Sequence, residues 1–256
     1  MAYRRPKTVF VLIAALLLMA SACAPKQALA PEDKKRAEAA RNLGEAYLKE
    51  GRYTAALGEF LKAEGLNPED AILQNDLGLV YMAKEKYDLA VGHFQKAVQL
   101  KPDYSLAKNN LGSAYLIRKE WTKAIPLLEE VTKDMLYATP HFPLTNLGWA
   151  YYNLGNYAKA EAYLEKALEL VPTFFLAQLN LGRTYLAQGR VRDALKHFEE
   201  AARSNPKNPA LLLEMGRAYR QLGDYASARL ALKGAIELTE DADLALEASD
   251  ELRKLY

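Results

Sequence analysis

The chain of 256 residues repeats one pattern about every 34 residues. The pattern centres on a Gly that follows a Leu or Met and recurs at Gly44, Gly78, Gly112, Gly148, Gly182 and Gly216. A Tyr stands three residues after each of these glycines, an Ala twelve residues after, and a Phe or Leu sixteen residues after. Such a unit buries its apolar face only against neighbouring units. The period therefore predicts a stack of repeated units.

The repeated residue types suit pairs of closely packed helices. The Gly and the Ala let two helices approach, while the aromatic and Leu side chains fill the space between them. Four units close with a Pro, which ends a helix because it has no backbone N–H: Pro68, Pro102, Pro172 and Pro206. A second Gly, seven residues after the first, is predicted to turn the chain with a positive φ in four units: Gly51, Gly155, Gly189 and Gly223.

This pattern resembles the tetratricopeptide repeat, a helix-turn-helix unit of about 34 residues. Six registered copies cover residues 37–240. The resemblance implies an all-α, right-handed superhelical solenoid of six tetratricopeptide repeats. Residues 241–256 place Leu244, Ala248, Leu252 and Leu255 at helical spacing with charged residues between them. We expect this segment to be the polar-backed capping helix that a solenoid needs at its open end.

The first 22 residues have the pattern of a signal peptide. Arg4, Arg5 and Lys7 precede thirteen uncharged residues, 8–20, and small residues follow. The apolar run is short for a transmembrane helix, which needs about 18 to 20 residues. We therefore expect an exported protein without a membrane-spanning segment.

Cys23 directly follows the small residues, which resembles the lipobox of bacterial lipoproteins. The resemblance implies that Cys23 is the first mature residue and carries acyl chains such as palmitate, which anchor the protein to the membrane. The alternative is ordinary cleavage that leaves a free thiol. Ala24 after the Cys implies the outer membrane, with the body facing the periplasm. Residues 23–36 are then expected to form a lipidated tether.

Composition argues against several classes of function. The 34 Lys and Arg residues nearly balance 32 Asp and Glu residues, so we expect no nucleic-acid partner. One Cys and three His residues argue against a structural zinc site or a disulfide. The sequence contains no Gly-rich loop of the kind that binds nucleotide phosphates, and we expect no small-molecule substrate or cofactor. His93 and His197 share one repeat position and are expected to pack, whereas His141 is expected in a loop. We expect no catalytic residue, no metal site and no enzyme activity.

The third repeat is two residues longer than the others and carries Asp134-Met135-Leu136-Tyr137, followed by Pro140 and Pro143. Residues 134–143 are either a simple surface insertion or a feature shared with a family of known function. A lipobox, a short tether, six repeats and this Asp-x-Leu-Tyr stretch resemble the pilotin lipoproteins of type IV pilus biogenesis. That resemblance implies an outer-membrane scaffold that assists assembly of a secretin.

Two other readings remain open at this stage. One is a general envelope adaptor that recruits peptidoglycan hydrolases or outer-membrane assembly factors. The other is a hydrolase or enzyme accessory, which needs a clustered acid/base pair that the sequence does not present.

Tetratricopeptide folds generally bind partners on the concave face, which the first helix of each repeat lines. An Asn two residues before the repeat Gly either clamps the backbone of a bound peptide or is repeat consensus only. Apolar residues after the Gly either contact the partner or are buried by neighbouring repeats, and aromatic and Arg residues are the usual interface anchors. The predicted groove is apolar in its middle repeats and basic in its last repeats. Such a groove suits a peptide with an apolar core and an acidic end. The predicted groove residues are Leu79, Met82, Asn110, Leu116, Asn146, Trp149, Tyr152, Asn180, Arg183, Arg217 and Arg220.

Overall fold

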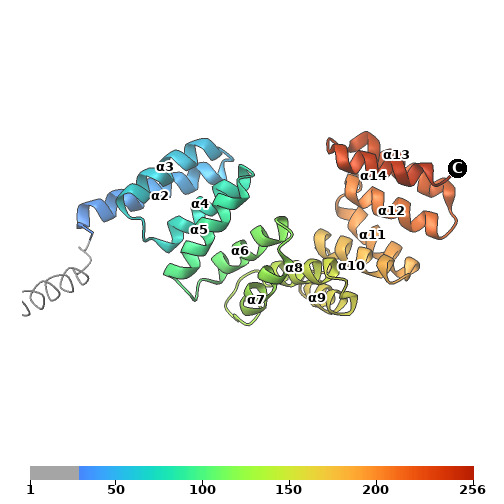
Figure 1. Ribbon diagram of the computed structural model, residues 1–256, viewed down its shortest axis with the longest axis horizontal. Coiled ribbons are helices and arrows are strands. Elements are labelled where there is room, and N and C mark those ends of the chain that lie inside the picture. Colours follow the sequence, from blue (N-terminus) through green and yellow to red (C-terminus); the bar gives the residue numbers. More distant parts are fainter. Residues whose placement is uncertain (1–28) are drawn as a thin grey trace, which may run out of the picture.

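The computed structural model describes residues 29–256. Within this range the chain forms thirteen α-helices and no strand, arranged in sequence order as a superhelical solenoid (Figure 1). The predicted signal peptide, Cys23 and the first residues of the predicted tether, up to residue 28, lie outside the described residues.

The helices form six antiparallel pairs, one pair for each repeat of the sequence. The first helices are α2 (Pro31–Lys49), α4 (Ala71–Ala83), α6 (Ser105–Ile117), α8 (His141–Asn153), α10 (Phe175–Ala187) and α12 (Pro209–Gln221). The second helices are α3 (Tyr53–Leu66), α5 (Tyr87–Leu100), α7 (Trp121–Val131), α9 (Tyr157–Leu170), α11 (Val191–Ser204) and α13 (Tyr225–Leu238). The all-α repeat solenoid predicted from the period is confirmed.

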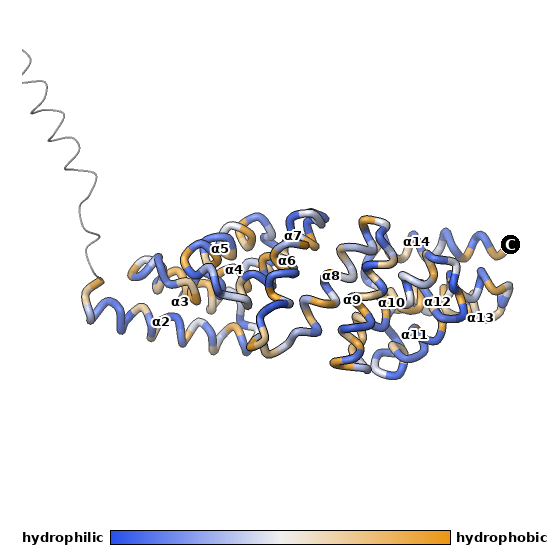
Figure 2. Tube along the Cα trace, turned by 90° about the horizontal axis from the view of Figure 1, so that it is seen from below, coloured by the Kyte–Doolittle hydropathy of each residue, from blue (hydrophilic) through white to orange (hydrophobic). Residues whose placement is uncertain are grey.

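The repeat Gly is the point at which the two helices of a pair meet. A Cβ added at Gly112 would lie 2.7 Å from Cδ2 of Leu128, and one added at Gly44 would lie 2.5 Å from Cε1 of Phe60. Both of these partner side chains are fully buried. Each helix buries one face and presents hydrophilic residues on the other, so apolar and polar segments alternate along the tube in Figure 2. The buried apolar residues form three clusters along the solenoid, and the largest of them extends from α5 to α12 because each pair packs on the next.

The turn glycines have the conformation predicted for them. Gly51, for example, has a φ of 72°, in the left-handed region that favours Gly. In the second and third repeats the same place is taken by Glu85 and Lys119, with φ values of 58° and 59°. The tertiary packing therefore imposes this turn even where the residue has a Cβ, at a local cost in conformational energy.

The N-terminal boundary differs from the prediction. The first helix begins at Pro31, six residues before the expected start of the repeats, so the helical part of the chain shortens the predicted tether 23–36. Pro31 occupies the first turn, where a missing N–H costs nothing, and Glu32 and Asp33 interact favourably with the positive end of the helix dipole.

The third repeat contains the irregular part of the fold. Its second helix, α7, has 11 residues where the other second helices have 14, and Pro126 lies inside it rather than at its start. Residues 132–140 then connect α7 to α8. Asp134 fixes this loop, since its carboxylate accepts a hydrogen bond from the Ser105 hydroxyl at 2.5 Å and from the Leu136 N–H at 2.9 Å.

His141 is the first residue of α8, so its assignment to the loop was wrong. Pro140 precedes the helix and Pro143 lies in its first turn, where a proline ring is compatible with helical geometry. The His141 ring packs edge-on against the Phe174 ring, with ring centroids 4.9 Å apart.

The C-terminal segment forms α14 (Ala242–Arg253), as predicted for 241–256. Asp241 caps this helix by accepting from the backbone N–H groups of Asp243 and Leu244. Ala248 is fully buried, and Leu244 and Leu252 pack against the same cluster, which closes the apolar side of the sixth repeat.

Candidate partner-binding groove

The candidate groove is the inner face of the solenoid, formed by the first helices of the repeats. In Figure 1, α8 and α10 lie on the inner side of the arc, whereas α7 and α9 lie on its outer side. We call this inner surface the concave face. Because consecutive first helices pack side by side, residues about 34 positions apart in the sequence become neighbours on it.

Two of the three groove asparagines form hydrogen bonds between repeats. The side-chain amide of Asn110 donates to Oδ1 of Asn75 at 2.8 Å, and that of Asn146 donates to Oγ of Ser113 at 3.0 Å. Asn180 is 7% exposed, and its Oδ1 accepts from Arg183 at 3.4 Å. The amides of Asn110 and Asn146 therefore tie adjacent first helices together, whereas the Asn180 bond lies within α10. These are structural roles that the repeat alone accounts for.

Two aromatic side chains of α8, Trp149 and Tyr152, form a cluster with one aromatic residue each of α7 and α9 at the middle of the concave face. The rings of Trp149 and Tyr152 stack with centroids 5.3 Å apart and an interplanar angle of 12°. Trp121 meets Trp149 edge-on at 6.5 Å, and Tyr157 lies 5.8 Å from Tyr152. Both Trp149 and Tyr152 are partly exposed. The guanidinium of Arg183 lies 5.3 Å from the centre of the Trp149 ring, within the range of a cation–π contact.

Trp121 and Tyr157 are members of this cluster that were not predicted from the sequence. Each is the first residue of a second helix, α7 or α9, and its ring contacts an aromatic ring of the first helix α8. The recurrence of a large side chain at this repeat position was the available signal.

The apolar groove residues divide into two groups. Leu116 is 6% exposed and belongs to the core, so its assignment to the groove was wrong. Met82 and Tyr152 hold the same repeat position and are partly exposed, so it is the packing of this particular repeat that covers Leu116. Leu79 and Met82 are partly exposed and pack against the edge of the same core.

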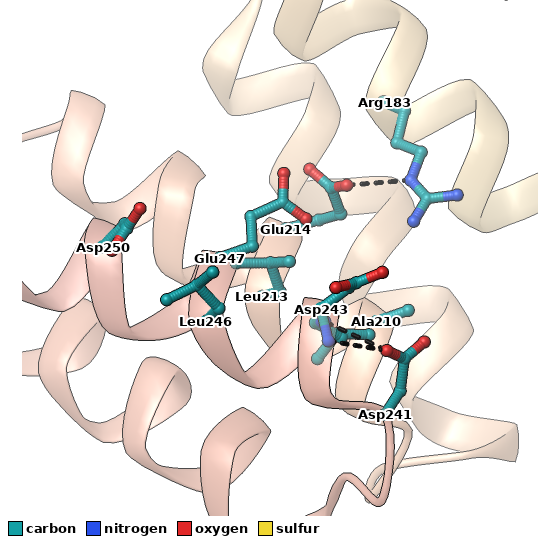
Figure 3. A pocket seen from close by; sticks show the side chains of 10 residues that line it. Arg183, Ala210, Leu213, Glu214, Asp241, Asp243, Leu246, Glu247 and Asp250 are labelled. Carbon is teal, nitrogen blue, oxygen red and sulfur yellow. Dashed lines mark hydrogen bonds and ion pairs between the residues drawn. The ribbon is translucent and has the colours of Figure 1, made fainter.

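A cavity of about 520 Å³ opens on the concave face at its C-terminal end (Figure 3). All of its lining residues come from α10, α12 and α14 or from the N-cap of α14, and none comes from a second helix. Five carboxylates line it, together with a single guanidinium and several apolar side chains: Glu214, Asp241, Asp243, Glu247, Asp250, Arg183, Ala210, Leu213, Leu244 and Leu246.

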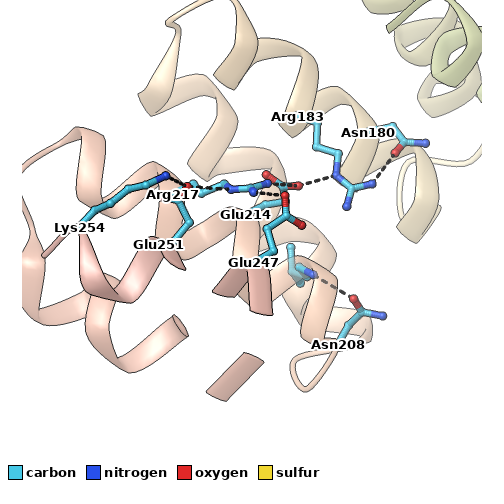
Figure 4. A network of polar contacts seen from close by, with 9 residues as sticks. Asn180, Arg183, Asn208, Glu214, Arg217, Glu247, Glu251 and Lys254 are labelled. Carbon is cyan, nitrogen blue, oxygen red and sulfur yellow. Dashed lines mark hydrogen bonds and ion pairs between the residues drawn. The ribbon is translucent and has the colours of Figure 1, made fainter. Parts of the chain in front are cut away.

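The predicted basic end of the groove is neutralised by acids of α12 and α14 (Figure 4). Nε of Arg183 lies 2.9 Å from Oε1 of Glu214. Arg217 contacts Glu214 at 3.3 Å and Glu247 at 2.5 Å. Nε of Arg220 lies 3.0 Å from Oε2 of Glu251 on the capping helix. The inference of a basic end that would attract an acidic peptide was therefore wrong.

A group of acids also lies at the other end of the concave face. Asp76 is 7% exposed, and its Oδ2 is buried without a hydrogen-bond partner among residues 29–256. Burial, followed by repulsion from Glu45, raises the pKa of Asp76 to about 7. Arg41 provides the adjacent positive charge, but it lies 2.8 Å from Asp70 and 3.2 Å from Glu45. Three carboxylates thus share one guanidinium.

His93 and His197 pack between helices, as their shared repeat position predicted. Nδ1 of His93 lies 2.8 Å from Oε1 of Gln74, and Nδ1 of His197 lies 2.6 Å from Oε1 of Gln178. Burial lowers the pKa of both imidazoles below their usual value. Each histidine therefore satisfies a buried glutamine of the preceding helix.

Among residues 29–256, no three His, Cys, Asp or Glu side chains are placed to hold a metal ion. No helix in this described range is both long and apolar enough to cross a membrane.

Comparison with protein families identifies tetratricopeptide repeats along nearly all of the described chain. One tetratricopeptide repeat profile matches residues 75–135 and 179–245, which together make half of the chain. A second matches residues 143–174, and a third repeat profile matches residues 44–85. These matches follow the same six units as the helix pairs.

Curated relatives match over runs of two or more repeats. A TPR repeat-containing protein, MJ0941, of Methanocaldococcus jannaschii is 39% identical over 69 residues, which are 27% of this chain and 20% of that protein. Human superkiller complex protein 3 is 37% identical over 128 residues, which are 50% of this chain and 8% of that protein. The chain spans a fifth or less of the length of these relatives, so they define the repeat and not the whole protein.

Solved structures match over most of the chain. PilF of Pseudomonas aeruginosa aligns with a TM-score of 0.71 and 22% identity, covering 86% of this chain and 99% of that one. PilW, described as a widely conserved type IV pilus biogenesis factor, aligns with a TM-score of 0.73 and 23% identity, covering 86% of this chain and 97% of that one. At these identities the likeness shows the fold. Together with the repeat profiles and the six helix pairs, it places the chain in the tetratricopeptide repeat family.

Proposed function

We propose that this protein is a non-catalytic, lipid-anchored scaffold of the outer membrane that acts as a pilotin, binding a secretin on its concave face during type IV pilus biogenesis. The single observation that carries the binding role is the partly exposed Trp149–Tyr152 stack in the middle of that face. A few residues supply most of the binding energy of a protein interface, and Trp, Tyr and Arg are enriched among them.

Two further observations support the pilus assignment. The fold aligns with nearly the full length of PilF and PilW, and PilW is a pilus biogenesis factor. The sequence around Cys23 resembles a lipobox, which agrees with a protein held at a membrane by acyl chains.

The binding role is tested with Trp149→Ala. Truncating an aromatic anchor commonly costs about 2 kcal/mol or more, which corresponds to about thirtyfold in affinity. We expect the variant to lose capture of the secretin from detergent-solubilised envelope and to reduce heat-stable secretin multimers. It should remain folded, with a melting temperature lowered by the loss of the ring contacts with Tyr152 and Trp121.

Tyr225→Ala is the matched control, because Tyr225 is an exposed aromatic residue at the start of the second helix α13. This control should retain capture. If secretin multimers are normal while the Trp149→Ala variant is present at normal abundance, the binding surface is not the aromatic cluster. Capture of peptidoglycan hydrolases or outer-membrane assembly factors instead of a secretin would favour the general envelope adaptor.

The anchor is tested with Cys23→Ser. We expect this variant to lose labelling by palmitate and to leave the outer-membrane fraction, since its hydroxyl cannot form the thioether to diacylglycerol. A variant that is still processed and still fractionates with the outer membrane would contradict lipidation at Cys23.

A further inference from the structure

The charge of the concave face defines the chemistry of the segment that it can bind. The cavity between α12 and α14 contains five carboxylates and one guanidinium (Figure 3). Of these acids, Glu214 and Glu247 are paired with Arg183 and Arg217, and Asp250 is paired with Arg253 outside the cavity. Asp241 accepts from backbone N–H groups, and within the described part of the chain no cation forms an ion pair with Asp243 or Asp241. The cavity therefore keeps an excess of negative charge after its internal ion pairs form.

The apolar part of the cavity lining is suited to an aliphatic chain. Leu213, Leu244 and Leu246 line the cavity together with Ala210, and the carboxylates surround them. A Lys or Arg side chain can bury its methylene stem on such a surface while its charged end contacts carboxylates. Hydrogen bonds between a cationic end and a carboxylate are stronger than those between neutral groups.

An independent observation at the N-terminal end of the same face also indicates a cationic partner. The buried Oδ2 of Asp76 has no donor in the region that the structure describes, although nine-tenths or more of the Asp76 residue is removed from solvent. Glu45 and Asp70 beside it already share Arg41. An added positive charge near this group would reduce the repulsion among three carboxylates, whereas an added negative charge would increase it.

We propose that the segment bound along the concave face is basic, and that one of its Lys or Arg side chains enters the cavity between α12 and α14. This inference rests on the proposed function, since it names the chemistry of the partner at the same surface. The charge of this segment is opposite to that of the acidic-ended peptide expected from the arginines alone. The apolar middle of the segment lies over Trp149 and Tyr152, and its basic residues lie toward the acidic ends of the face.

The test uses two fluorescent peptides that share an apolar centre rich in Leu and Pro and differ only at their ends. One peptide carries lysines at both ends and the other carries glutamates. Binding to the full mature chain in detergent is measured by fluorescence anisotropy. We expect the lysine peptide to bind, and to bind more weakly as salt rises from about 50 mM to about 500 mM, because screening weakens charge pairing. The glutamate peptide should bind at least about tenfold more weakly.

The cavity is then tested with Asp243→Asn/Asp250→Asn, which removes two charges and leaves the acids bound to Arg183 and Arg217 in place. We expect about tenfold weaker binding of the lysine peptide and a smaller dependence on salt. Asp88→Asn/Asp103→Asn is the control, because it makes the same change in net charge on α5 and in the turn after it. This control should bind like the unaltered protein.

The proposal is overturned if the glutamate peptide binds as tightly as the lysine peptide, or if both double variants bind the lysine peptide equally. Failure of the proposed function has a different signature. If the lysine peptide binds but the captured envelope partner is not a secretin, the basic specificity stands and the pilotin role falls. If Trp149→Ala abolishes secretin capture and the lysine peptide does not compete, the pilotin role stands and the basic specificity falls.

Discussion

Replacing Asp76 by Asn should stabilise the first repeats of the solenoid at neutral and alkaline pH. The same repeat position holds Asn110, Asn146 and Asn180 in later repeats, so an amide fits there. In the folded protein the Asp76 carboxylate is buried near Glu45 and Asp70, with Arg41 and Tyr104 as the other charged or titratable neighbours. The Asp76→Asn substitution keeps the shape of the side chain and removes the charge.

The expected size follows from the pKa of Asp76, which is raised from 3.8 to about 7. A shift of one pKa unit corresponds to about 1.4 kcal/mol, so ionised Asp76 lowers the unfolding free energy by about 4 kcal/mol at pH well above 7. Because the pKa of Asp76 is higher in the folded protein than in the unfolded chain, protonated Asp76 favours folding. This contribution to the unfolding free energy of the unaltered protein is fully present below about pH 4 and is lost as pH rises through about 7. The unfolding free energy of Asp76→Asn minus that of the unaltered protein should increase by about 2 to 4 kcal/mol between pH 4 and pH 8.

The measurement is hydrogen exchange at the amides of α2 to α4 together with urea unfolding, both at a series of pH values. Hydrogen exchange is needed because a repeat array can lose its end repeats before the rest unfolds. Asn146→Asp is the matched control, since its new carboxylate would face the Ser113 hydroxyl, a group that can donate. A difference between Asp76→Asn and the unaltered protein that does not change with pH would refute the reasoning.

Three other substitutions and one deletion test the packing. Gly112→Ala should destabilise the protein by about 2 kcal/mol or more in urea unfolding, because its Cβ would meet buried Leu128, whereas Gly92→Ala in open space on α5 should stabilise it by up to about 1 kcal/mol; equal effects would contradict the close-approach role. Glu85→Gly should raise the melting temperature, with a gain of about 1 kcal/mol, because it relieves a positive φ, and a loss would show that the turn is not strained. Deleting 241–256 should expose the apolar side of the sixth repeat and cause self-association in size-exclusion chromatography, and a monodisperse truncation would show that α14 is not a cap.

Much of the fold could be predicted from the sequence because the residues that contact one another in a solenoid are close together in the sequence. Gly112 and Leu128, which meet in the core, are separated by sixteen residues within one repeat, and Gly51 marks a turn between adjacent helices. Each repeat contacts only its neighbours, so six copies of one local pattern specify the helix pairs, their stacking and the capping helix. The same logic located the Trp149–Tyr152 pair on the inner face, since residues on one helix face recur at helical spacing.

The charge and accessibility of that inner face were decided only by the tertiary structure. Arg217 looked like a free basic group in the sequence, yet Glu247, thirty residues later, lies 2.5 Å from it. Leu116 and Tyr152 both stand four residues after the repeat Gly, but the packing of neighbouring helices buries the first and leaves the second partly exposed. A repeat period fixes which helices are adjacent, because that depends on chain order and apolar spacing. Which side chains then pair or become covered depends on separations of a few ångströms between helices, and only the packed structure sets these distances.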